Sequence, residues 1–207
     1  LILCGVKDGD EVIVPTITFI ATVNAVLYCH ANPIFMDCDK TLNIDVDKIL
    51  SFLKHNTYFL NNKTYNKKTK RKISAIMFTN VFGNLSNLKN LFKECKRRNI
   101  KLIEDAAESL GSFYLKKIQH SGLNADYGTL SFNVNKIITT GSGGAILFKK
   151  KSEKKKIKKL INQGKSNNLL YKHDILGYNY GMSNISAAIG CAQFKNIKYI
   201  LNKKKKN

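Results

Sequence analysis

Three consecutive stretches of the sequence indicate its fold: Ile73-Ser-Ala-Ile-Met-Phe78, Leu88-Lys-Asn-Leu-Phe-Lys-Glu-Cys-Lys-Arg-Arg98 and Lys101-Leu-Ile103. Short runs of apolar and β-branched residues predict strands, and apolar residues at helical spacing predict a helix. A strand, a helix and a second strand in this order indicate two parallel strands joined by a crossover helix. These stretches therefore favour an α/β domain.

The same alternation extends in both directions along the chain. Further strands are predicted at Glu11–Val14, Pro33–Met36, Gly128–Phe132 and Ala145–Phe148. Further helices are predicted at Thr18–Tyr28, Asp45–Leu53 (capped by Asn43 or Asp45), Ser152–Asn162 and Ser183–Leu201. The polar, lysine-rich segment Asn56–Lys72 is predicted to be an exposed loop. The expected fold class is α/β, with a mainly parallel (mixed) sheet flanked by helices. Ligands of such sheets bind beyond the carboxyl ends of the strands.

The composition restricts the possible partners. The formal net charge is +21, but only Arg71, Arg97 and Arg98 are arginines among 35 basic residues. Proteins that recognise nucleic acids rely strongly on arginine. A lysine-rich surface with weak attraction to polyanions is therefore preferred to a nucleic-acid-binding domain, which stays an alternative.

Cysteine, histidine and hydropathy patterns limit the compartment and the chemistry. The five cysteines form no C-x-x-C pair, which predicts free thiols in a reducing compartment, the cytoplasm. The four histidines lack metal-ligand spacing, so no metal is expected. No apolar run approaches the roughly 20 residues that cross a membrane. The chain opens without Met and without a signal-peptide pattern, and we expect it to be truncated at the N-terminus.

Asp105 is the first candidate for a residue of a ligand-binding or catalytic site. It ends the apolar stretch in Ile103-Glu-Asp-Ala-Ala-Glu-Ser-Leu-Gly111. A carboxylate at the carboxyl end of a strand can point into a ligand site. The alternative is an N-cap aspartate that opens the next turn.

Lys136 is the second candidate. It lies in Gly128-Thr-Leu-Ser-Phe-Asn-Val-Asn-Lys-Ile-Ile-Thr-Thr-Gly-Ser-Gly-Gly144, between a strand and a glycine-rich turn. Glycines allow close backbone approach, and hydroxyls with N–H groups, such as Ser131, suit a phosphate. A lysine held there is a candidate nucleophilic amine. The alternative is an ordinary surface lysine.

Phe19 is the third candidate. It follows the predicted strand in Pro15-Thr-Ile-Thr-Phe-Ile-Ala-Thr-Val-Asn-Ala25 and could stack on a flat ring. The alternative is a core residue.

Taken together, several blocks resemble one family, in its order and approximate spacing. They are Gly9-Asp-Glu-Val-Ile-Val-Pro15, Glu104-Asp-Ala-Ala-Glu108, Ser131-Phe-Asn-Val-Asn-Lys136, Thr139-Thr-Gly-Ser-Gly-Gly144 and Gly177-Tyr-Asn-Tyr180. The sequence resembles the DegT/DnrJ/EryC1/StrS sugar aminotransferases over essentially its whole length. The turn after Lys136 looks most like the branch that serves bacillosamine, legionaminic acid and perosamine pathways.

The resemblance implies a role for each matched residue. Pyridoxal 5'-phosphate (PLP) is the implied cofactor, and Lys136 the implied Schiff-base lysine. Asp105 would pair with the pyridine nitrogen, Glu108 would lie near the ring hydroxyl and Phe19 would stack on the ring. Ser131 would bind the cofactor phosphate. Asn179 would reach the phosphate of the neighbouring subunit's cofactor, which implies a homodimer with shared active sites.

The implied reaction transfers an amino group from glutamate to the keto carbon of a nucleotide-linked keto-deoxysugar. Residues 1–207 would form the large PLP-binding domain of a fold type I aminotransferase and would lack the small C-terminal domain. A PLP-dependent sugar dehydratase of the same fold is a near alternative, but that type carries histidine in place of the Schiff-base lysine. A non-catalytic relic of the fold is another.

The sequence departs from the family pattern at four positions. Gly181 stands where arginine usually follows the Gly-Tyr-Asn-Tyr block, and Asn80 stands where histidine is common. Val134 and Ser142 replace small residues or glycine. None of the four alters Lys136 or Asp105. We therefore interpret them as substitutions that adjust the site or that arose by neutral drift.

Overall fold

A computed structural model describes residues 1–114, 119–167 and 169–204. The chain divides into two compact units, Leu1–Leu130 and Ser131–Asn207.

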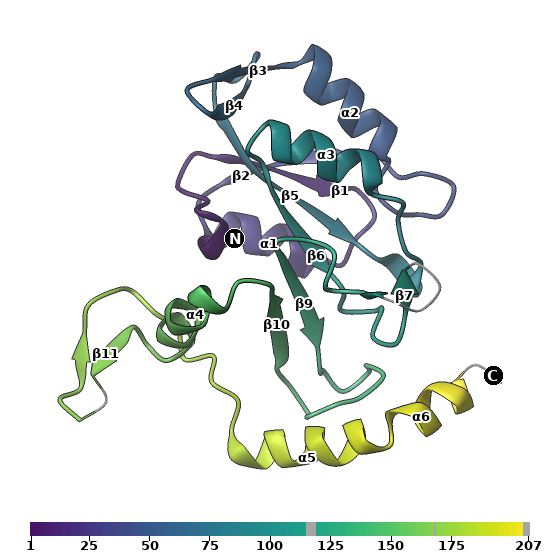
Figure 1. The fold of residues 1–207 in the computed structure, drawn as a ribbon, viewed down its shortest axis with the longest axis vertical. Helices are drawn as coiled ribbons and strands as arrows, with labels where there is room; N and C mark the ends of the chain where they lie inside the picture. Colours follow the sequence, from purple (N-terminus) through teal and green to yellow (C-terminus); the bar gives the residue numbers. More distant parts are fainter. Residues whose placement is uncertain (115–118, 168, 205–207) are drawn as a thin grey trace. The chain divides into compact units, whose positions relative to one another are not determined.

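A mainly parallel sheet forms the centre of the first unit (Figure 1). Its strand order is β9-β6-β5-β1-β2, and these neighbours all pair in parallel. The strands are β1 (Glu11–Pro15), β2 (Asn32–Met36), β5 (Lys72–Thr79), β6 (Lys101–Asp105) and β9 (Tyr127–Ser131). Because β5 is central and buried along nearly its whole length, its sequence is apolar without alternation. The predicted α/β fold is confirmed, with shifts of one or two residues at strand ends.

Helices cover both faces of this sheet. Val26 of α1 (Ile20–Tyr28) packs in one cluster with Val12 and Val14 of β1. The next residue of β1, Ile13, points to the opposite face and packs in a cluster with α2 (Val46–His55) and α3 (Lys89–Arg97). Figure 1 shows α2 and α3 on the same side of the sheet. Asp45 caps α2, since its side chain accepts a hydrogen bond from the Lys48 N–H at 3.0 Å.

The segment Asn56–Lys72 corrects the sequence prediction, because it contains a β-hairpin rather than only a loop. Strands β3 (Thr57–Leu60) and β4 (Lys63–Asn66) pair with each other, and β4 adds to β5 in the antiparallel sense, which makes the sheet mixed. The buried Asn66 donates a hydrogen bond to Glu11 Oε2 at 2.9 Å, and the buried Thr64 donates to the Arg98 carbonyl. The inward-facing residues are polar, so hydrophobic alternation could not reveal the strands.

The second unit contains the strand β10 (Gly144–Phe148) and three α-helices. The helices are α4 (Lys154–Ile161), α5 (Asn184–Lys195) and α6 (Ile197–Lys204). The single helix predicted at Ser183–Leu201 is in fact two, because the backbone of Asn196 leaves the helical region at ψ 10°. Ser183 caps α5 by accepting from the Ser186 N–H at 3.1 Å.

Short elements complete both units; the sequence predicted none of them except the first 3-10 helix, because Leu1-Ile-Leu-Cys-Gly5 looks like the tail of a helix. They are the hairpins β7 (Phe113–Tyr114) with β8 (Gln119–His120) and β11 (Lys165–Asn167) with β12 (Lys172–His173), and the 3-10 helices η1 (Ile2–Cys4), η2 (Val81–Gly83) and η3 (Lys151–Glu153). Within the described ranges, no helix is both long and apolar enough to span a bilayer. Residues 1–114, 119–167 and 169–204 also hold no group of three His, Cys, Asp or Glu side chains arranged to bind a metal.

Candidate functional site

Asp105 and Thr79 mark the edge of the sheet where a ligand is expected. They are the last residues of the neighbouring strands β6 and β5, and they are paired in register. The carboxyl ends of parallel strands meet at this edge, as the sequence predicted.

The Asp105 carboxylate is held by donors from two elements. Its Oδ1 accepts from the Ala107 N–H at 3.1 Å, and its Oδ2 accepts from the Thr22 hydroxyl at 2.7 Å. The first bond closes a turn of the kind that the N-cap alternative anticipated, but no helix begins there in the described part of the chain. The second bond joins β6 to the first turn of α1. Asp105 is therefore fixed in orientation at the sheet edge.

Phe19 lies at the start of the same helix. It is the N-cap residue of α1, and its carbonyl accepts from the Thr22 N–H at 3.0 Å. Its side chain is 75% exposed, so Phe19 is a surface residue and not a core residue. The exposed ring leaves a flat apolar face for a planar ligand.

Glu108 lies on the loop that follows Asp105. Its Oε2 accepts a hydrogen bond from the Phe82 N–H at 3.1 Å. Phe82 adopts φ 52°, an uncommon backbone conformation for a bulky residue, and the Glu108 bond helps to hold it there. In the first unit, the structure thus brings Asp105 and Phe19 onto one connected edge through Thr22, and it places Glu108 three residues after Asp105.

A buried polar network behind this edge was not predicted from the sequence. Glu104 is fully buried, and it accepts from Asn80 Nδ2 at 2.7 Å and from the Asn124 N–H at 3.0 Å. The Tyr114 hydroxyl lies 3.4 Å from Glu104 Oε1 and 3.2 Å from Asn80 Oδ1. Burial, followed by the negative charge of Glu104, raises the pKa of the Tyr114 phenol well above its usual value. Tyr114 thus stays a hydrogen-bond donor at all physiological pH values.

Ser131 and Lys136 both belong to the second unit, where Ser131 is the last residue of β9 and Lys136 lies on the turn that leads to β10. The Lys136 N–H donates to the Asn133 carbonyl at 3.1 Å, and the Asn133 N–H lies 3.4 Å from Ser131 Oγ. Gly141 and Gly143 adopt φ 80° and 99°, which other residues rarely adopt. The glycine-rich turn predicted after Lys136 is therefore present.

Gln193 supports this turn, although no sequence pattern indicates its role. Its side chain accepts from the Thr139 N–H at 2.9 Å and donates to the Thr139 carbonyl at 2.8 Å. This pair of bonds ties the turn to α5. A pairing of residues 54 positions apart cannot be read from spacing in a single sequence.

Asn179 lies on a separate segment of the second unit. Its neighbours Tyr178 and Tyr180 donate backbone hydrogen bonds to the end of α4, and their rings stack at 5.0 Å. Asn179 itself is exposed. Among the described residues of this unit, the structure brings Lys136 and Ser131 together and leaves Asn179 on a different segment.

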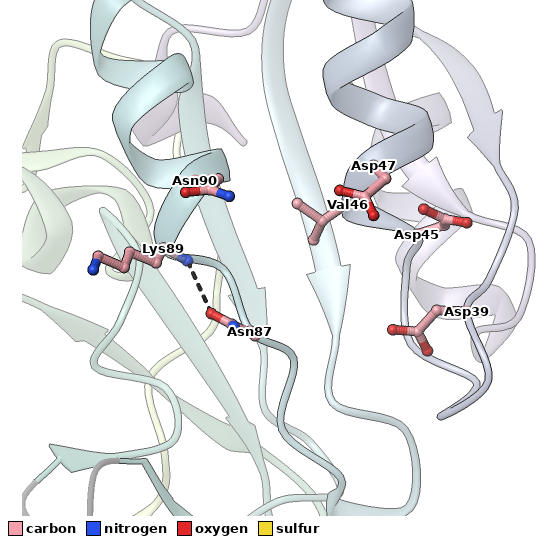
Figure 2. Close-up of a pocket in the computed structure, with 7 residues that line it drawn as sticks. All are labelled: Asp39, Asp45, Val46, Asp47, Asn87, Lys89 and Asn90. Carbon is pink, nitrogen blue, oxygen red and sulfur yellow. Dashed lines mark hydrogen bonds between the residues drawn. The ribbon is translucent and has the colours of Figure 1, made fainter.

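The first unit also contains a cavity of about 340 Å³ that none of the six predicted residues lines. Figure 2 shows Asp39, Asp45 and Asp47 at and before the start of α2, and Asn87, Lys89 and Asn90 around the start of α3. Asp45 already caps α2 and Asp39 already accepts from Thr41, so these groups have structural roles.

Comparisons with known proteins give one consistent result. Residues 1–207 match the DegT/DnrJ/EryC1/StrS aminotransferase family. The chain is 37% identical to GDP-perosamine synthase of Escherichia coli O157:H7 over 205 residues, which cover 99% of this chain and 52% of that protein.

Solved structures agree on the fold. The chain is similar to a DegT/DnrJ/EryC1/StrS aminotransferase from Brucella abortus, with a TM-score of 0.83 at 23% identity, covering 95% of this chain and 50% of the other. It is also similar to the PLP form of Spr1654 from Streptococcus pneumoniae, with a TM-score of 0.81 at 25% identity, covering 99% and 53%. The chain thus spans about half the length of the relatives that it matches.

Proposed function

We propose, because this chain belongs to the DegT/DnrJ/EryC1/StrS aminotransferase family, that it is the cofactor-binding part of a PLP-dependent enzyme. The enzyme transfers an amino group from glutamate to the keto carbon of a nucleotide-linked keto-deoxysugar. The observation that carries the proposal is Asp105, which is fixed at the carboxyl end of β6 by Thr22 and Ala107.

The residues of the first unit fit PLP. A carboxylate can accept about four hydrogen bonds, and two acceptor positions of Asp105 are used by Thr22 and Ala107. The Asp105 carboxylate can therefore still accept a hydrogen bond from the pyridine N–H of the cofactor. The Phe19 ring is exposed beside the same helix turn and can stack on a planar heterocycle. Glu108 supplies a further polar group on the next loop.

We propose roles for residues of the second unit from the resemblance of their sequence blocks to those of the family, and the family match supports this proposal. Lys136 would hold the cofactor covalently, and in its neutral form it would accept and return the proton that moves during amino transfer. Ser131 would donate a hydrogen bond to the cofactor phosphate, and the glycines after Lys136 would allow the backbone to come close. PLP, when bound, supplies the electron sink of the reaction. Lys136 rather than histidine at this position also favours an aminotransferase over a dehydratase.

The substrate class and the assembly belong to the same proposal. GDP-perosamine synthases from three bacteria are 35–38% identical to this chain, which supports a nucleotide-linked sugar as the amino acceptor. Asn179 is exposed and would contact the cofactor phosphate of a second copy, which makes a homodimer the functional unit. The five cysteines form no C-x-x-C pair, which suits a reducing compartment, so we propose that the enzyme works in the cytoplasm.

Visible absorbance of the complete gene product with added PLP tests the proposal. We expect a band that survives dialysis, is lost in Lys136→Ala and persists in the control Lys154→Ala, whose lysine is exposed on α4. Adding glutamate should bleach the band as the amino form of the cofactor accumulates. A wild-type protein that retains no PLP after dialysis would overturn the proposal.

A further inference from the structure

We propose that Thr22, supported by Thr18 and Thr79, is a positioning residue that orients Asp105 toward the ring nitrogen of the cofactor. This inference rests on the proposed function. It concerns how the first unit holds the carboxylate, and it assigns a role to three hydroxyls whose pairing the sequence does not reveal.

The three threonines form a continuous chain of hydrogen bonds that ends on Asp105. The Thr22 hydroxyl donates to Asp105 Oδ2 at 2.7 Å. The Thr18 hydroxyl donates to Thr22 Oγ1 at 2.8 Å, and Thr18 Oγ1 lies 3.0 Å from Thr79 Oγ1. The chain therefore connects the end of β5, the start of α1 and the end of β6.

The direction of every bond in this chain is fixed by proton counting. Each hydroxyl has one proton to donate. Thr22 gives its proton to Asp105 and Thr18 gives its proton to Thr22, so the Thr18–Thr79 bond must use the proton of Thr79. All three donors therefore point toward the carboxylate. Hydrogen bonds aligned in one direction polarise and strengthen each other.

The surroundings make the chain rigid. Thr22 is 2% exposed and Thr79 is 5% exposed, so water does not compete effectively for their hydroxyls. A hydrogen bond from a buried hydroxyl to a carboxylate is stronger than one between neutral groups. With Oδ2 held by Thr22 and Oδ1 held by Ala107, the carboxylate cannot rotate without breaking one of the two bonds.

The same chain also positions Phe19. Phe19 is followed by the first turn of α1, and Thr18 and Thr22 bracket it in sequence and bond to each other. Because Thr18 is also linked to Thr79 on β5, the start of α1 is anchored to the sheet edge. A planar ring that stacks on Phe19 would meet an Asp105 carboxylate of defined orientation.

The test compares Thr22→Val with Thr22→Ser in the complete gene product. Valine keeps the shape of threonine and removes the hydroxyl, whereas serine keeps the hydroxyl. We expect the dissociation constant for PLP to rise about tenfold in Thr22→Val, the change that one lost hydrogen bond to a charged group produces. Thr22→Ser should restore the wild-type value, and Thr18→Val should show a smaller rise.

A PLP analogue with carbon in place of the ring nitrogen separates positioning from a general structural effect. The analogue has no N–H for Asp105, so its affinity should be nearly equal in wild type and Thr22→Val. The control Thr64→Val removes another buried hydroxyl, which donates to the Arg98 carbonyl on the far side of the unit's sheet from α1. It should lower the melting temperature of the apoprotein and leave PLP affinity unchanged.

The outcomes are distinguishable from those of the parent proposal. If wild type retains PLP but Thr22→Val binds PLP as tightly as Thr64→Val does, the positioning role is wrong and the function stands. Equal losses for PLP and for the analogue would also overturn the role, since they indicate general damage. If wild type itself does not bind PLP, the proposed function fails first.

Discussion

Glu104 is fully buried, and its carboxylate replaces the lost water with hydrogen bonds from Asn80 and Asn124, with Tyr114 nearby. It directly precedes Asp105, so the network also fixes the end of β6. Burying a carboxylate is costly unless its acceptor positions are filled. Asn80, which stands where the family commonly has histidine, is one of the residues that fill them here.

We predict that Glu104→Ala destabilises the protein far more than Tyr114→Phe. The first change takes the acceptor from buried Asn80 and from the half-buried Asn124 and Tyr114, and it should cost about 3–5 kcal/mol. The second removes one donor and should cost about 1 kcal/mol. Urea unfolding followed by circular dichroism measures both values. Similar costs for the two variants would contradict the assigned network.

At the scale of single residues, the sequence predicted where a residue lies on a strand or helix better than it predicted which side chains contact each other. It placed Asp105 at the end of a strand because an apolar run precedes it, and the structure confirms that placement. The partner Thr22 lies 83 positions away, and nothing in the local pattern around either residue indicates the pairing. Side-chain hydrogen bonds across such distances depend on strand register and helix docking, which a single sequence does not contain.

Among the elements, the C-terminus of α3 and the hairpin β3–β4 are joined mainly through Arg98. Its guanidinium binds Glu94, and Nη1 donates to Thr57 Oγ1 at 2.9 Å. Arg97 binds the same carboxylate, with Nη2 2.6 Å from Glu94 Oε1, but its side chain is 64% exposed. Hydrogen bonds from Arg97, opposed in part by burial and reinforced by Arg98, lower the pKa of Glu94 to about 2.

We predict that Arg98→Ala loosens the hairpin and that Arg97→Ala does not. Loss of the buried guanidinium should cost about 2–4 kcal/mol because Thr57 and Glu94 lose a buried partner. Loss of the exposed one should cost less than about 1 kcal/mol. Hydrogen exchange of residues 57–66 should quicken in the first variant alone; equal exchange in both would refute the link.

Some helices and strands could be predicted from the sequence and others could not. Strands β1, β5 and β6 are largely buried and mostly apolar, and β2 carries the apolar run Ile34 to Met36, so all four were predicted within a residue or two. Strands β3 and β4 were missed because their inward residues are polar and pair with Glu11 and Arg98. The break at Asn196 was missed because the residues on both sides favour a helix.

At the scale of the whole molecule, the net charge of +21 is spread over 35 basic and 14 acidic residues. The described lysines of α4 and the turn before it are mostly exposed, and Ile157 alone is buried in that helix. Such a surface attracts polyanions without reading their sequence.

We therefore predict that the chain binds duplex DNA weakly and without sequence preference. Binding should fall by orders of magnitude between about 50 and 200 mM salt, as expected for phosphate contacts alone. Replacing Lys154, Lys155 and Lys156 with glutamine should reduce the salt dependence, and fluorescence anisotropy with two unrelated duplexes measures both effects. Retention of one duplex over the other at 200 mM salt would instead favour the nucleic-acid-binding alternative.

The position of β5 in the sheet has a consequence for synthesis on the ribosome. β1 ends at Pro15, yet one of its two edges pairs with β5, which begins only at Lys72. While the intervening residues are being translated, the nascent chain carries a strand with three consecutive apolar residues, Val12 to Val14, and an unpaired edge. Parallel pairing of distant segments is slow to form, so early chains are exposed to aggregation. Trigger factor or a similar holdase should thus raise the soluble yield more than a lower culture temperature does.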